Sequence, residues 1–265
     1  MTPPSPIPIP NRLRSNRLSE IHDKQGFVVG TFLEIPAPQI VELLGLAGFD
    51  FVVIDREHGS IDLETTENLI RAAVSTGICP LVRVSHCDPI VIRQPLDMGA
   101  AGVHVPQIET AEQARQSVRA AKFFPQGERG LQPYVRAASY RAFPTAEFLQ
   151  ETNENVVIVL HIEGKRGVAA FDEIVQVEGV DVAFLGPYDL SQSLGIPGMV
   201  QSPLVREKMT AIVEKAKGKP LAIGTYCDDV NTALEWRNLG VTYLAVSLDA
   251  HILFQAARRM ISRLK

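Results

Sequence analysis

Residues 51–84, FVVIDREHGSIDLETTENLIRAAVSTGICPLVRV, contain a strand–helix–strand unit. The apolar run that begins at Phe51 has the length of a strand, and ETTENLIRAAVSTG then repeats its apolar residues with a helical period up to Gly77. A second apolar run, ICPLVRV, begins at Ile78. Two strands separated by a helix are typical of parallel neighbours in one sheet. This unit therefore predicts an α/β protein.

The same alternation of apolar runs and amphipathic stretches extends over the rest of the chain. Further runs of strand length begin at Phe27, Gly102, Val156, Asp181, Pro220 and Thr242. About eight βα units result, which is the count of a closed (β/α)8 TIM barrel; an open doubly wound sheet is the alternative. We expect one barrel domain over residues 27–265, preceded by a proline-rich arm and a short helix over residues 1–26.

The composition and charge of the chain indicate which kind of molecule it binds. The chain has 265 residues, of which 46% are hydrophobic, and a formal net charge of -4 with no basic cluster. We therefore expect a small-molecule substrate, with neither nucleic acid nor a membrane as partner. The proline-rich start, MTPPSPIPIP, is unlike a signal peptide. The three cysteines of the whole chain indicate neither a disulfide framework nor a zinc site. These features predict a cytoplasmic protein.

One stretch lacks both the helical and the strand period. Residues 124–144, FPQGERGLQPYVRAASYRAFP, are rich in Gly, Pro, Arg and Tyr. Long loops in compact domains are often lids or walls of a functional site. We expect this segment to have such a role.

In a (β/α)8 barrel the chemistry lies at the carboxyl ends of the strands, so the first polar residues after each apolar run are the candidates. They are Asp55, Arg56, Glu57, His58, Arg83, His161, Glu163 and Asp189, the last preceded by Gly186 and Pro187. We expect these residues to form one site.

Glu163 and Asp189 follow adjacent strands, so a closed barrel would bring their carboxylates together. Two carboxylates without cysteine favour a hard cation such as Mg2+ or Mn2+, with water and substrate oxygens as further ligands. The alternative is that each acid only caps the helix that follows it.

His58, in the sequence DREH, is a candidate general base if a carboxylate holds its other ring nitrogen. Asp55, Glu57 and Asp97 could each do so, and the alternative is a structural histidine.

Arg83 ends an apolar strand, where a guanidinium needs an anionic partner. That partner is either a substrate oxyanion or a buried salt bridge to Asp55 or Glu57. Phe32 could form a wall of the same pocket, or simply belong to the core.

The stretch GPYDLSQSLG is a strand-to-helix turn. The first amide groups of a helix are free to bind an anion. We assign the amides of Tyr188 and Asp189 to a substrate carboxylate; an ordinary helix cap is the alternative.

Taken together, these residues resemble a known family. DREH at 55–58, LVRVSHCDP around Arg83, QPLDMGAAGVHVPQI around Asp97, Arg129–Gly130, HIEG around Glu163, VEGVD from Val177 and GPYDLSQSLG resemble the HpcH/HpaI aldolases in order and spacing, from about Phe27 to the C-terminus. The family comprises metal-dependent pyruvate aldolases, typified by 4-hydroxy-2-oxoheptanedioate aldolase. The resemblance implies a phosphoenolpyruvate/pyruvate-type barrel.

The resemblance also implies individual roles. Glu163 and Asp189 would hold a divalent metal, Mg2+ or Mn2+ with Co2+ as a further candidate. His58 would be the base, Asp97 would pair with it and raise its basicity, and Arg83 would stabilise the enolate oxygen.

Three residues depart from the family pattern. His161 stands where the family often has a Gln that contacts substrate, Tyr188 where it often has Ala, and Arg56 where Gly is frequent. Substrate would contact Arg83, His161 and the turn Gly186–Asp189, with Arg56 as a further pocket wall. These departures leave the aldehyde open.

The resemblance further implies a homo-oligomer, a hexamer built as a trimer of dimers that exchange their last helix. The C-terminal stretch DAHILFQAARRMISRL has the apolar stripe needed to dock on a partner, although the same stripe could close its own barrel.

We therefore expect a class II aldolase that cleaves a 4-hydroxy-2-oxo acid into pyruvate and an aldehyde. An oxaloacetate decarboxylase or a lyase acting on a CoA thioester is the alternative on the same barrel, although no basic site for an adenine phosphate is apparent. A catalytically silent binding or assembly barrel would predict that the acids, His58 and Arg83 do not converge.

Overall fold

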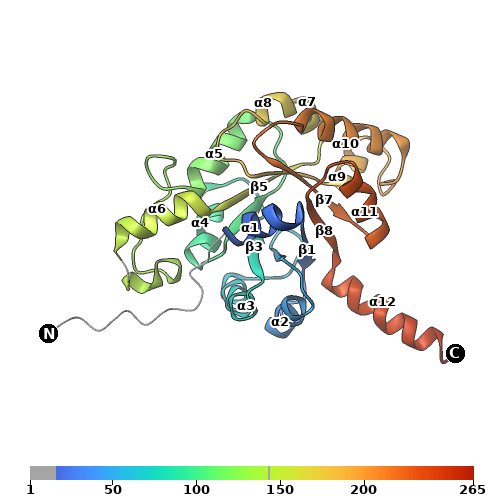
Figure 1. Ribbon diagram of the computed structural model, residues 1–265, viewed down its shortest axis with the longest axis horizontal. Coiled ribbons are helices and arrows are strands. Elements are labelled where there is room, and N and C mark those ends of the chain that lie inside the picture. Colours follow the sequence, from blue (N-terminus) through green and yellow to red (C-terminus); the bar gives the residue numbers. More distant parts are fainter. Residues whose placement is uncertain (1–15, 143) are drawn as a thin grey trace.

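The computed structural model describes residues 16–142 and 144–265, so the expected proline-rich arm before the short helix lies outside the described residues. Eight parallel strands form a closed barrel in chain order, which confirms the predicted (β/α)8 fold over an open sheet (Figure 1). The strands are β1 (Val28–Leu33), β2 (Phe51–Asp55), β3 (Cys79–Arg83), β4 (Gly102–Val105), β5 (Val157–Ile162), β6 (Val182–Leu185), β7 (Ala222–Cys227) and β8 (Tyr243–Leu248). Each lies within or overlaps one of the eight predicted runs.

Helices surround the barrel. They are α1 (Asn16–Gln25), α2 (Pro38–Leu46), α3 (Leu63–Thr76), α4 (Pro89–Asp97), α5 (Ala111–Ala121), the 3-10 helix η1 (Arg136–Arg141), α6 (Thr145–Asn155), α7 (Lys165–Ala169), α8 (Phe171–Ile174), α9 (Pro187–Ser193), α10 (Pro203–Ala216), α11 (Val230–Asn238) and α12 (Asp249–Ser262). Side chains such as those of Asp62 and Ser202 accept amide hydrogens of the next turn and so begin their helices. Within the described ranges, each helix is too short or too polar to cross a lipid bilayer.

The register of the strands sets which side chains meet inside the barrel. Asp55 on β2 lies opposite Arg83 on β3, and Arg83 lies opposite His104 on β4. Side chains alternate between the two faces of a strand, so residues an even number of positions apart point to the same side. Phe51, four residues before Asp55, and Leu81, two residues before Arg83, therefore also point inward, and both belong to an apolar cluster. The interior is therefore apolar near the amino ends of the strands and polar near their carboxyl ends.

None of the described residues of the long segment 124–144 lines the cavity described below, contrary to our expectation of a lid or wall. The segment follows α5, which runs back from the carboxyl ends of the strands, so it begins at the opposite end of the barrel. There Arg129 Nη2 donates to Asp97 Oδ1 at 2.7 Å, and Arg136 Nη1 donates to the Met98 carbonyl at 2.8 Å. The segment packs against the end of α4 instead.

The C-terminal helix α12 extends away from the barrel (Figure 1). Only Asp249, its first residue, is buried, and its carboxylate accepts the amide hydrogens of Glu34 and Ile35, both at 3.0 Å. Large apolar side chains farther along, including Leu253 and Phe254, are each 58% exposed. The helix therefore does not close its own barrel.

Candidate functional site

A cavity of about 230 Å³ lies at the carboxyl ends of the strands. It is lined by Phe32, Glu34, Asp55, His58, Arg83, His161, Glu163, Phe184, Gly186, Pro187, Tyr188, Asp189, Tyr226 and Leu248. Most of the residues predicted from the strand ends thus come together in one place.

Arg83 is held on three sides. Its Nε donates to Asp55 Oδ1 at 2.9 Å while Nη2 donates to Oδ2, and Nη1 lies 3.2 Å from Glu57 Oε2. The guanidinium carbon lies 4.8 Å from the centre of the Phe32 ring. Both salt bridges considered for Arg83 are therefore present, and its remaining N–H groups are available to the cavity because a guanidinium has five.

Asp55 is fully buried and organises the turn after β2. Its Oδ1 also accepts the backbone N–H groups of Glu57 at 2.9 Å and His58 at 3.3 Å. Burial alone would raise the pKa of Asp55, but the hydrogen bonds and charge of Arg83 lower it overall. For Arg83, burial acts to lower the pKa, and Asp55 and Glu57 raise it overall. The pair is therefore firmly ionised.

His58 reaches the cavity from this turn, and its side chain is 60% exposed. The carboxylate nearest to it is that of Glu57, whose Oε2 lies 3.9 Å from His58 Nε2. Burial raises the pKa of Glu57. Glu57 therefore takes the place beside His58 that the resemblance gave to Asp97.

Asp97 itself lies at the end of α4, away from the cavity. It pairs with Arg129, whose side chain is 1% exposed, and Arg93 Nε lies 3.7 Å from its other oxygen. Within one chain the predicted pair of Asp97 and His58 is not formed, because α4 carries Asp97 back toward the amino ends of the strands.

Arg56 does not line the cavity either. Its Nε donates to the Ile61 carbonyl at 3.4 Å, and its buried Nη1 has no hydrogen-bond partner among the described residues. Burial lowers the pKa of Arg56. Its side chain therefore lies along the β2–α3 connection and not in the predicted pocket wall.

Glu163 and Asp189 face the same cavity. Glu163 is 5% exposed; its Oε1 accepts the backbone N–H of Gln107 at 2.8 Å, and its Oε2 lies 3.2 Å from His161 Nδ1. Burial acts to raise the pKa of Glu163, but His161, the Gln107 amide and Arg83 lower it overall. Burial and then the charge of Glu163 raise the pKa of Asp189. Two carboxylates in mutual repulsion are a donor set that a divalent cation would neutralise.

The described residues contain no group of three or more His, Cys, Asp or Glu side chains arranged to hold a metal ion. A metal at this site would therefore take Glu163 and Asp189 from the protein and its other ligands from water or substrate. This arrangement fits Mg2+ or Mn2+, which keep several such ligands.

The turn before α9 brings Gly186 against Glu163. A Cβ atom on Gly186 would lie 2.6 Å from Glu163 Oε2 and 2.8 Å from Glu163 Cβ. Glycine is therefore required here by close approach, and it lets the first turn of α9 approach the carboxylate.

Several residues of the site were not predicted. Glu34 and Tyr226 line the cavity, and Gln107 adopts a left-handed conformation with φ of 57° that aims its amide at Glu163. Tyr188 donates from its hydroxyl to Asp228 Oδ1 at 2.8 Å, and burial raises the pKa of Tyr188 to about 12. The available signal was the position of Glu34 directly after β1 and of Tyr226 near the carboxyl end of β7.

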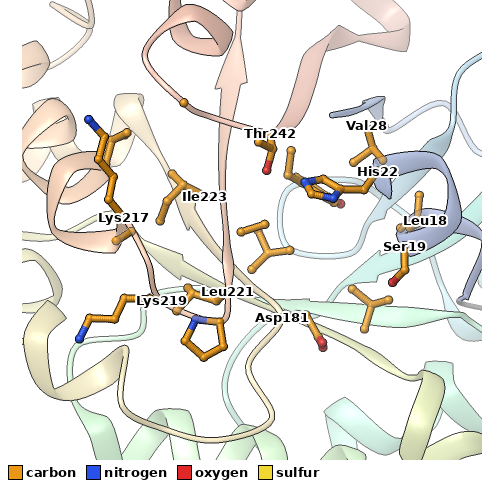
Figure 2. A pocket seen from close by; sticks show the side chains of 18 of the residues that line it. Leu18, Ser19, His22, Val28, Asp181, Lys217, Lys219, Leu221, Ile223 and Thr242 are labelled. Carbon is orange, nitrogen blue, oxygen red and sulfur yellow. The ribbon is translucent and has the colours of Figure 1, made fainter. Parts of the chain in front are cut away.

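A larger hollow, of about 530 Å³, lies at the opposite end of the barrel (Figure 2). It lies between α1, which contributes Leu18 and His22, and the stretch before β7, which contributes Lys217 and Lys219. Both lysines are exposed, and the paired carboxylates lie at the other end. We therefore place the candidate active site in the smaller cavity, as the barrel fold predicts.

Comparison with known proteins identifies the family of this chain. Residues 29–256 match the family described as HpcH/HpaI aldolase/citrate lyase. The hydroxypyruvate/pyruvate aldolase of Deinococcus radiodurans is 35% identical over 238 residues, which cover 89% of this chain and 85% of that enzyme. The 5-keto-4-deoxy-D-glucarate aldolase of Salmonella paratyphi A is 34% identical over 242 residues, covering 90% and 93%. The crystal structure of an HpcH/HpaI aldolase from Desulfitobacterium hafniense superposes with a TM-score of 0.88 at 30% identity, covering 94% and 96%.

Proposed function

The chain belongs to the HpcH/HpaI aldolase/citrate lyase family and is a carbon–carbon lyase of the aldolase type, and we propose that it reversibly cleaves 4-hydroxy-2-oxo acids into pyruvate and an aldehyde. The observation that carries the proposal is the convergence of Glu163, Asp189, His58 and Arg83 on one cavity. A catalytically silent barrel predicted that these groups would lie apart.

We propose that Glu163 and Asp189 hold a divalent metal, Mg2+ or Mn2+ with Co2+ as a further candidate. When bound, the cation would polarise the 2-oxo group of the substrate and lower the cost of forming an enolate. The first-turn amides of Tyr188 and Asp189 would bind the substrate carboxylate, since such amides lack acceptors within the helix.

In the direction of cleavage, His58 would take the proton of the 4-hydroxyl group. The C3–C4 bond then breaks, its electron pair passes into the enolate of pyruvate, and the hydroxyl carbon leaves as the aldehyde. Arg83 would stabilise the negative charge on the enolate oxygen with an N–H group that its two carboxylate partners leave over. Glu57, 3.9 Å from His58, would stabilise the protonated imidazole.

The aldehyde half would lie beside Glu34, Tyr188 and Tyr226. Burial and then the charge of Asp55 raise the pKa of Glu34, and Asp228 adds further negative charge nearby through its bond to Tyr188. A carboxylate at this wall disfavours an anionic aldehyde. We therefore propose a neutral aldehyde as the natural partner of pyruvate.

Substitution of Glu34 tests this specificity. Glu34→Gln should raise kcat/KM for condensation of pyruvate with glyoxylate, relative to glycolaldehyde, by roughly tenfold, because one like charge is removed at short range. Glu42→Gln, on the exposed side of α2, is the matched control. An unchanged ratio in Glu34→Gln would remove Glu34 from the specificity assignment.

We also propose a homo-oligomer, a trimer of dimers, in which α12 packs on a neighbouring copy. The exposed Leu253 and Phe254 on α12 support an intermolecular contact, as do Leu43 and Leu46 of α2, which are 61% and 79% exposed. Exposed large apolar side chains that are grouped on one helix, as on α12, are typical of an interface.

The activity is tested on protein stripped of metal with a chelator. Pyruvate release from 4-hydroxy-2-oxo acids should require added Mg2+, Mn2+ or Co2+ and disappear in Glu163→Gln. The family description also names citrate lyase, so oxaloacetate and a CoA thioester should be assayed in parallel. Turnover of either in preference to every 4-hydroxy-2-oxo acid would favour the decarboxylase or the CoA lyase over the aldolase.

A further inference from the structure

Four buried side chains form a continuous line of hydrogen bonds through the barrel. Glu163 Oε2 lies 3.2 Å from His161 Nδ1, His161 Nε2 lies 2.9 Å from His104 Nδ1, and His104 Nε2 lies 2.8 Å from the Tyr243 hydroxyl. The line starts at the cavity and ends at Tyr243, the first residue of β8. It therefore crosses the interior from the carboxyl ends of the strands to their amino ends.

The three side chains beyond Glu163 in this line are almost completely shielded from bulk water. His104 is fully buried, and His161 and Tyr243 are 1% and 2% exposed. Aromatic neighbours fix the rings: Phe184 stacks on His161 with centroids 4.6 Å apart, and Phe51 stacks on Tyr243 at 4.2 Å. Because a buried polar atom without a partner destabilises the fold, each of the three contacts needs one hydrogen between its two atoms.

The direction of these hydrogen bonds follows from the Glu163 end. A carboxylate that serves as a metal ligand can only accept, so His161 Nδ1 must carry the hydrogen. A neutral His161 then accepts at Nε2, which requires a hydrogen on His104 Nδ1. His104 in turn accepts at Nε2 from the Tyr243 hydroxyl. Each of the three hydrogen bonds then has one donor and one acceptor, with both imidazoles and the phenol uncharged.

We infer that His104 and Tyr243 are positioning residues that hold His161 as its Nδ1–H tautomer, so that His161 donates to Glu163 and fixes that carboxylate for the metal. The inference rests on the proposed function in one respect, the role of Glu163 as a metal ligand. If the hydrogen bonds ran in the opposite direction, the lone pair of His161 Nδ1 would point at the Glu163 carboxylate, and the two would repel. Outer partners that orient a ligand typically contribute to metal affinity in this way.

The environment of the chain agrees with uncharged groups. Burial, the largest cause, holds the pKa of His104 well below its ordinary value, so this imidazole stays uncharged. Burial raises the pKa of Tyr243 well above its ordinary value, so the phenol keeps the hydrogen that it donates.

Tyr243 can be substituted without changing a residue that lines the candidate active site. It does not line the candidate active site but borders the hollow at the other end of the barrel, where it lies opposite Val28 of β1. A change in metal binding on substitution of Tyr243 would therefore be transmitted through the imidazoles and not through contact with substrate.

The first measurement is the tautomer state of the histidines in metal-free protein. Two-dimensional long-range 1H–15N spectra of protein labelled in its six histidines distinguish the Nδ1–H from the Nε2–H form, with His104→Gln and His161→Gln supplying the assignments. We expect His104 and His161 both to be in the Nδ1–H form. Either ring in the Nε2–H form would overturn the direction of the chain, whether or not the protein is an aldolase.

The second measurement is the affinity for Mn2+ by titration calorimetry. Tyr243→Phe keeps the ring and removes the donor, and it should weaken Mn2+ binding on the order of tenfold. Ser117→Ala removes a fully buried hydroxyl that donates to the Gln113 carbonyl on α5, outside the chain, and should leave the affinity unchanged.

A double substitution distinguishes a positioning role of Tyr243 from an effect of Tyr243 on packing. In His161→Gln the amide can donate to Glu163 whatever the state of His104, so adding Tyr243→Phe should cause little further loss of Mn2+ affinity. Equal losses in both backgrounds, or no loss in Tyr243→Phe alone, would overturn the positioning role. Failure of the wild-type protein to bind Mn2+ would instead contradict the proposed metal site, while the tautomers still test the chain.

Discussion

Gly186→Ala should weaken metal binding by displacing Glu163. An alanine Cβ at this position would lie 2.6 Å from Glu163 Oε2, so the carboxylate would have to move by about 0.8 Å to reach an ordinary contact. The backbone of Gly186, with φ of -90° and ψ of 97°, is open to alanine, so the cost arises from the contact with Glu163. We expect Mn2+ affinity to fall on the order of tenfold to a hundredfold.

Gly164→Ala is the matched control, because this glycine directly follows Glu163. Its added Cβ would meet only Glu109 Oε1, at 3.7 Å, which is an ordinary contact. Mn2+ titration of both variants, with thermal unfolding followed by circular dichroism, separates a displaced ligand from a damaged fold. Gly186→Ala protein that is folded and binds Mn2+ as tightly as Gly164→Ala would refute the reasoning.

Three further predictions concern the buried ion pair and the C-terminal helix. Arg83→Lys keeps a charge near Asp55 but loses the forked contact, and we expect kcat/KM to fall on the order of a hundredfold in a pyruvate-release assay; near-normal turnover would remove Arg83 from the chemistry. Because the pKa of Asp55 is lowered from its ordinary value of 3.8, its carboxylate stabilises the fold above that pH and the contribution is lost as the pH falls through the lowered pKa. Urea unfolding should therefore give Asp55→Asn a lower free energy of unfolding than the wild type at neutral pH, and a smaller decrease of that free energy as the pH falls. Parallel curves of the free energy of unfolding against pH for the two proteins would contradict this. Phe254→Glu should yield a smaller particle in sedimentation velocity, because a charge enters the exposed apolar face of α12; an unchanged mass would mean that α12 does not hold the oligomer together.

The fold could be predicted because two periodicities alternate along the whole chain. Runs such as that from Phe51 are apolar at nearly every position, as expected for strands covered on both sides. Since the barrel places the carboxyl ends of its strands at one rim, Glu163 and Asp189 could be brought to the same site from their positions alone.

Other features depended on information that the spacing does not contain. Asp97 and the segment 124–144 lie near the amino ends of the strands, because the helices before them reverse the direction of the chain. The direction in which α12 leaves the barrel could not be predicted, because the sequence pattern allowed the helix either to dock on a partner or to close its own barrel.

The interior hydrogen-bonded chain was missed although a signal was present. His104 interrupts the apolar run GVHVP, and Tyr243 is the second residue of TYLAVSL. Strand alternation places His104 inward, as it does Arg83 and His161 on the neighbouring strands. A search for polar residues at inward positions, and not only at strand ends, would have found it.

The exchange of pyruvate methyl protons with deuterated solvent tests the central claim most directly, because it needs no knowledge of the aldehyde. We predict that metal-stripped protein leaves the methyl signal in the 1H spectrum unchanged, that Mg2+ or Mn2+ makes it decay, and that Glu163→Gln abolishes the decay. Absence of exchange in the wild-type protein with every divalent metal, at saturating pyruvate, would contradict an enolate site built on Glu163 and Asp189.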